Sequence, residues 1–137
     1  MVETNQLLKT IQETKSDGLN TLMESLDDLT FSEYLNHIID AKHISKAQVL
    51  SKTTIQRNYG YQIFDGSNVP NKDKVIQLSL GLGLDLRMTN NLLSLSNNGM
   101  LYPKVKRDAL LIYCIENHKS VYETNECLME YRLELLD

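Results

Sequence analysis

Four polar side chains at helical spacing are the residues of this sequence best suited to specific recognition. Arg57 is four residues before Tyr61, and Asn58 is four residues before Gln62, so the two pairs share one face of any helix that contains them. A guanidinium can donate two parallel hydrogen bonds to guanine, and a carboxamide can pair in the same way with adenine. The pattern indicates reading of base edges, with an ordinary solvated helix face as the alternative.

The remaining positions of this segment lie on the opposite face of the same helix. We expect this face to pack against the core of the protein. Its members are mostly apolar: Ile55, Tyr59, Gly60, Ile63 and Phe64. A helix over residues 56–64 is therefore predicted, and a shorter helix over residues 46–52 precedes it, with Thr53 to Ile55 between them. Two short helices joined in this way are typical of a helix-turn-helix unit, in which the second helix enters the major groove. We expect this unit over Ser45 to Gly66.

The rest of the chain shows helical spacing, so the expected fold class is all-α. Capping-box spacing predicts helix starts at Thr30, Ser45 and Ser120. The expected organisation has three parts: an acidic helical extension over residues 1–29, a helix-turn-helix domain over 30–97, and a C-terminal helical hairpin over 98–137 that packs on this domain.

The charge distribution favours one region for contact with nucleic acid. The 137 residues carry a formal net charge of -4, which by itself argues against binding to phosphates. Residues 1–36 have a net charge of -5 and residues 77–137 a net charge of -2, whereas residues 37–76 have a net charge of +3. The local sign determines which ligands a surface attracts, so the segment with the four polar side chains is electrostatically suited to DNA.

These segments resemble a known family. Ser45 to Gly66, followed by Asn71 to Leu84, resembles the Xre family of phage-repressor-like helix-turn-helix proteins. The stretch YGYQIFDGSNVPNKDKVIQLSLGLGL, residues 59–84, is especially similar to a bacterial subgroup that also tends to contain a segment like LYPKVKRDALLIYCI, here residues 101–115. The resemblance covers residues 30–117 and implies five helices, of which the second and third form the DNA reader.

The resemblance also implies roles for individual residues. The base-reading positions are Arg57, Asn58, Tyr61 and Gln62. The positions that contact phosphate or support the reader are Ser45, Lys46, Asn71, Lys72 and Lys74. The helix that begins after Asn71 could meet a phosphate through its free backbone N–H groups and its dipole.

Three residues depart from the family pattern. Leu50 occupies a position where a small residue is usual, and Gly60 one where a branched apolar residue is usual. We expect these two to compensate, because the larger side chain fills the space that Gly leaves. Thr54 replaces the common glycine of the turn and leaves the turn geometry open.

Other possible sites are weaker, and we expect no catalytic residue, cofactor or metal. The three histidines share no metal-ligand spacing with Cys114 or Cys127, and Gly81-Leu-Gly83 lacks the rest of a dinucleotide-binding motif. The basic residues Lys104, Lys106 and Arg107 could touch DNA, but an ordinary helix start beside Asp108 is favoured. No signal peptide or apolar run of about 18 residues is present, and both cysteines suit a reducing compartment, so a cytoplasmic location is expected.

Together these patterns predict a sequence-specific DNA-binding transcriptional regulator that is not an enzyme. Its partner would be double-stranded DNA, bound by a homodimer because one short helix contacts few bases. The apolar residues expected to form the dimer contact are Tyr122, Leu128, Tyr131 and Leu135. The alternative is a protein-interaction module that keeps this fold and binds a protein partner through the N-terminal helix or the C-terminal hairpin.

Overall fold

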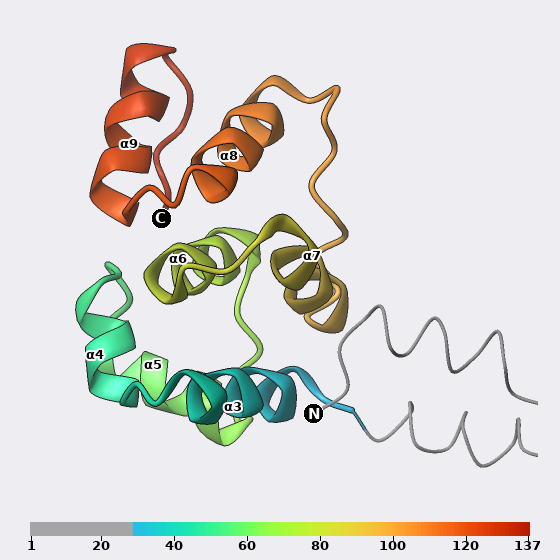
Figure 1. The fold of residues 1–137 in the computed structure, drawn as a ribbon, viewed down its shortest axis with the longest axis vertical. Helices are drawn as coiled ribbons and strands as arrows, with labels where there is room; N and C mark the ends of the chain where they lie inside the picture. The colour runs from blue at the N-terminus through green and yellow to red at the C-terminus, as the bar shows by residue number, and fades with distance from the viewer. Residues whose placement is uncertain (1–28) are drawn as a thin grey trace, which may run out of the picture.

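The computed structural model describes residues 29–137, so the expected N-terminal extension lies outside the described residues except for Leu29. Seven helices occur in this part of the chain (Figure 1): α3 (Phe31–Lys42), α4 (Lys46–Ser51), α5 (Arg57–Asp65), α6 (Lys72–Leu82), α7 (Leu86–Leu95), α8 (Lys106–Glu116) and α9 (Val121–Glu130). Residues 29–137 contain no strand, which confirms the all-α prediction for them.

The helices begin where the local sequence predicts. The Gln48 N–H donates to Ser45 Oγ (3.1 Å) and the Ser45 N–H donates to Gln48 Oε1 (2.9 Å), so the capping box of α4 is complete. The box at Ser120 is also complete, whereas Thr30 makes only one half of its box by accepting the Glu33 N–H. Each of these bonds satisfies a backbone donor that the helix itself leaves free.

Helix α6 is the centre of the fold. Every residue from Val75 to Leu82 is buried, as expected for a helix that is surrounded by others. It packs against α4, α7 and α9, and Figure 1 shows it between a layer made of α3, α4 and α5 and the hairpin of α8 and α9. Because α6 contacts both groups, it sets their relative position.

Helices α4 and α5 approach each other closely at Gly60. A Cβ atom added to Gly60 would lie 2.7 Å from Leu50 Cδ1 and closer still to Cδ2, although side chains do not tolerate contacts below 3.0 Å. Leu50 is only 5% exposed and fills this space. The expected compensation between Leu50 and Gly60 is therefore confirmed.

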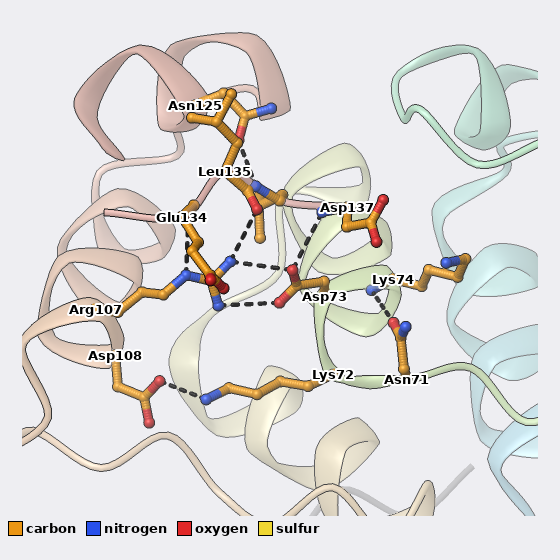
Figure 2. Close-up of polar contacts among 11 residues, drawn as sticks. Asn71, Lys72, Asp73, Lys74, Arg107, Asp108, Asn125, Glu134, Leu135 and Asp137 are labelled. Atoms are coloured by element: carbon orange, nitrogen blue, oxygen red, sulfur yellow. Dashed lines mark hydrogen bonds and ion pairs between the residues drawn. The ribbon is translucent and has the colours of Figure 1, made fainter. Parts of the chain in front are cut away.

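A polar cluster joins the C-terminal hairpin to the start of α6 (Figure 2). Lys72 Nζ lies 2.5 Å from Asp108 Oδ1, and the Arg107 guanidinium donates two 3.0 Å hydrogen bonds to the Asp73 carboxylate. Arg107 Nε also donates to the Glu134 carbonyl oxygen (3.0 Å), which fastens the returning C-terminal segment. Arg107 and Asp108 thus serve the packing of α8.

One residue assigned to the dimer contact lies in the core instead. Leu128 is fully buried within its own chain, because it faces the interior of the hairpin. Its assignment to a surface contact is wrong. Tyr122, Tyr131 and Leu135 are exposed, and Tyr131 and Leu135 follow the last residue of α9.

The two cysteines lie on the facing helices of the hairpin and are both free thiols. Cys114 is buried, and this burial raises the pKa of its thiol above the ordinary value. Cys127 is partly exposed. Among the described helices, none has the length and apolar content needed to cross a membrane.

The contact between Gly60 and Leu50 leads to a prediction about stability. Alanine normally stabilises a helix by about 1 kcal/mol relative to glycine, but overpacking a buried site costs about 1–3 kcal/mol. We expect Gly60→Ala to lower the free energy of unfolding by about 1 kcal/mol, because the Leu50 side chain must leave its present packed position to admit the new methyl group. Urea denaturation of the full chain measures this change.

The matched control is the same substitution in a Leu50→Ala background. With the leucine removed, Gly60→Ala should stabilise the protein by about 1 kcal/mol, since only its effect on helix propensity remains. The sign of the effect should therefore reverse between the two backgrounds. A Gly60→Ala protein as stable as the wild type would contradict the packing argument.

Candidate nucleic-acid interface

Helix α5 presents a polar face to solvent. Arg57, Asn58, Tyr61 and Gln62 are all exposed, as their spacing predicts. On the other side of the helix, Gly60, Ile63 and Phe64 are buried against the core. The four side chains thus project from one helix whose position is fixed by the packing of its opposite side.

The connection before α5 is fixed by a buried glutamine of α6. Gln77 is fully buried, and its Oε1 accepts hydrogen bonds from the Thr54 N–H (2.7 Å) and from Thr54 Oγ1 (3.0 Å). Sequence reasoning left the turn geometry at Thr54 open and did not identify Gln77. The available signal was a glutamine within the mostly apolar run of α6, because buried amides need hydrogen-bond partners.

Both ends of α5 have their own capping contacts. At the start, the Gln56 side chain accepts the Tyr59 N–H (2.9 Å). At the end, Gly66 adopts the left-handed conformation (φ 86°) that favours glycine, and Asn36 of α3 donates to the Phe64 carbonyl oxygen (2.9 Å). Asn36 was also absent from the sequence prediction, because it lies 28 residues from its partner.

The loop after α5 folds back on the helix. The Asn68 N–H donates to the backbone oxygen of Gln62 (3.1 Å), and Asn68 Nδ2 donates to the side-chain oxygen of Gln62. Ser67 donates to Asp65 Oδ1 through its hydroxyl (2.6 Å) and its N–H (2.8 Å). These two bonds, from the Ser67 side chain and then its backbone, lower the pKa of Asp65 below its ordinary value.

The other polar pair of α5 is held within the helix. The Arg57 guanidinium lies 5.7 Å from the centre of the Tyr61 ring, and Arg57 Nη2 is 3.5 Å from Tyr61 Oη. This long hydrogen bond and the cation–π contact bias the orientation of the guanidinium while most of its donors stay available. Asn58, which follows Arg57 in the first turn of the helix, is exposed as well.

Two lysines flank the polar face of α5. Lys46 Nζ lies 5.7 Å from the centre of the Phe64 ring near the end of α5, and Lys74 Nζ lies 5.5 Å from the Tyr59 ring. Ser45, the exposed N-cap residue of α4, adjoins Lys46. Lysines that lie beside a helix in this way can contact a phosphate backbone while the helix faces the bases.

The structure gives other partners to two residues expected at the phosphate positions. Lys72 is paired with the largely buried Asp108, and its side chain is only 35% exposed. The Asn71 side chain caps α6 by accepting the Lys74 N–H (3.0 Å). Figure 2 shows Lys72 directed toward Asp108 of α8, and the neighbouring Asp73 of α6 directed toward Arg107 of α8. Lys72 thus supports the hairpin, and Asn71 supports the start of α6.

The exposed side chains of α5 offer both donors and acceptors of hydrogen bonds. Across residues 29–137, no group of three or more His, Cys, Asp or Glu side chains could hold a metal ion.

No family model, curated protein or solved structure matches the chain. Its function must therefore be inferred from the residues themselves.

The bond between Gln77 and Thr54 predicts a local effect that can be measured directly. Gln77→Leu keeps a similar volume but removes the acceptor of the Thr54 N–H, so this amide should exchange with solvent at least about tenfold faster. Thr54→Val removes the hydroxyl but leaves the Gln77 acceptor, so the backbone amide at this position should stay protected. Hydrogen exchange followed by NMR distinguishes the two, and equal exchange rates at residue 54 in both variants would refute the assignment.

Proposed function

We propose that this chain is a sequence-specific DNA-binding transcriptional regulator that reads the major groove with α5. In this proposal α4 and α5 form the helix-turn-helix unit of an Xre-like five-helix domain. Arg57, Asn58, Tyr61 and Gln62 face base edges, and Lys46 and Lys74 face phosphates.

The observation that carries the proposal is the two-sided character of α5. Its apolar side is held by the close contact at Gly60, and its connections are held by Gln77 and Asn36. Its polar side has four exposed hydrogen-bonding side chains, none of which belongs to the buried core. A rigid helix that carries base-reading residue types, with cations on both flanks, matches the requirements for direct readout.

A homodimer is part of the proposal, because a nine-residue reader helix contacts too few bases for useful selectivity. Helix α9 offers a suitable surface. Tyr122 and Met129 are seven residues apart on one face of α9, and they are 74% and 64% exposed. Exposed large apolar side chains are common at interfaces between subunits.

The DNA-binding proposal predicts a position-specific effect of Arg57. Arg57→Ala should weaken binding to a selected operator by at least about fivefold, because a bidentate arginine–guanine contact contributes about 1–3 kcal/mol. The loss of affinity should depend on one base pair of the operator, and it should be larger for the operator than for unrelated DNA. Gel-shift titrations at several salt concentrations measure both quantities.

Lys106→Ala is the matched control, since Lys106 is the exposed first residue of α8, and Figure 1 shows α8 on the other side of α6 from α5. It should leave the operator preference unchanged. Binding of the wild-type chain that does not weaken with salt, or no binding to any genomic fragment, would refute the proposal.

The proposed dimer predicts that two substitutions on α9 lower the mass of the protein in solution. The wild-type chain should be dimeric by light scattering at tens of micromolar, and Tyr122→Glu combined with Met129→Glu should make it monomeric because two charges would be buried at the contact. Both side chains are exposed in the isolated chain, so its circular dichroism should not change. A wild-type monomer at this concentration would contradict the dimer.

A further inference from the structure

We propose that Asn68 determines which base Gln62 selects, by fixing the orientation of the Gln62 carboxamide. This inference rests on the proposed function and concerns the specificity of the same face. The carboxamide would turn its Nε2 donor toward the DNA, so Gln62 would favour a base whose major-groove edge offers acceptors. Guanine, with O6 and N7, meets this condition best.

The orientation follows from the chemistry of the contact between the two amides. Asn68 Nδ2 is a donor, and the atom that it contacts is Gln62 Oε1. A carboxamide has an acceptor end and a donor end, so a partner that binds the oxygen leaves the NH₂ group on the other side. Gln62 is exposed, and no packing contact is needed to explain its orientation.

Asn68 can impose this orientation because its own backbone is fixed. Its N–H donates to the backbone oxygen of Gln62 (3.1 Å), so the loop is bonded to the residue whose side chain it orients. The preceding Ser67 is bonded twice to Asp65. The Asn68 side chain therefore approaches Gln62 from an ordered turn, and Gln62 loses less conformational freedom when it binds a base.

The constraint also narrows what Gln62 can recognise. A free glutamine pairs bidentately with adenine by accepting from N6 and donating to N7. Asn68 already occupies one side of Oε1 and holds it toward the loop, which leaves the donor as the outward group. Asn68 is therefore a positioning residue, which shapes specificity without itself touching the base.

Selection of bound DNA from a random library tests this inference with the full chain. Gln62→Ala identifies the base pair that Gln62 reads, because only the preference at that position should disappear. At this base pair the wild type should favour guanine, and Asn68→Ala should reduce the preference by about threefold to tenfold, the effect of one hydrogen bond.

Asn68→Asp provides the sharper test. A carboxylate only accepts hydrogen bonds, so the Gln62 NH₂ group should turn toward it and expose Oε1 to the DNA. The preference should then shift from guanine to a base with a major-groove donor, such as cytosine with its N4 amino group. The added negative charge weakens binding to all sequences, so the readout is the relative base preference.

Asn97→Asp is the control for charge, because Asn97 is exposed beyond the end of α7 and the same charge is added there. It should leave the preference at the Gln62 base pair unchanged. The inference is overturned if Asn68→Ala and Asn68→Asp both keep the wild-type preference in a selection that otherwise succeeds. If the wild-type chain enriches no sequence, the proposed function itself fails, and the inference fails with it.

Discussion

The two hydrogen bonds that Gln77 accepts from Thr54 determine how α5 is placed in this fold. Gln77 belongs to α6, which is buried along most of its length and therefore cannot move without disturbing the core. Through Thr54, the start of α5 is tied to this helix. Gln77 Nε2 has no hydrogen-bond partner within residues 29–137, so burial of this amide costs free energy that only its bonds to the turn offset.

Two further contacts complete the placement of α5. The absence of a side chain at Gly60 lets α5 lie directly against Leu50 of α4, and Asn36 of α3 binds the last turn through the Phe64 carbonyl oxygen. Because α5 is held at its start, middle and end, its exposed side chains project from a fixed frame. Such preorganisation reduces the entropy that a binding surface loses when it meets its partner.

The sequence predicts the features that depend on neighbours along the chain. Local spacing predicts the helix starts at Ser45 and Ser120 and the two faces of α5. Residue size predicts that Leu50 fills the space left by Gly60. Contacts between distant residues could not be foreseen. Gln77 is 23 residues from Thr54, and Lys72 is 36 residues from Asp108, so no periodicity relates them.

Leu128 shows that the burial of an apolar residue also depends on contacts between distant parts of the chain. An apolar side chain on a predicted helix can face the core or a partner, and the choice depends on how the helix is rotated against its neighbours. Local spacing contains no information about this rotation before the fold is known. Packing of α9 against α8 and α6 buries Leu128 and leaves Tyr122 exposed.

The ion pairs at the start of α6 bear on how the proposed surface would work. They pair the cation Lys72 and the anion Asp73 with residues of α8. Because one charge of each sign is paired, the net charge of the remaining groups in residues 37–76 is still +3. This charge is modest, and phosphate contacts alone would give weak, salt-sensitive binding. Selectivity would then have to come from hydrogen bonds made by oriented side chains. The contacts that hold Arg57 against Tyr61 and Gln62 against Asn68 restrict these side chains before any ligand is bound.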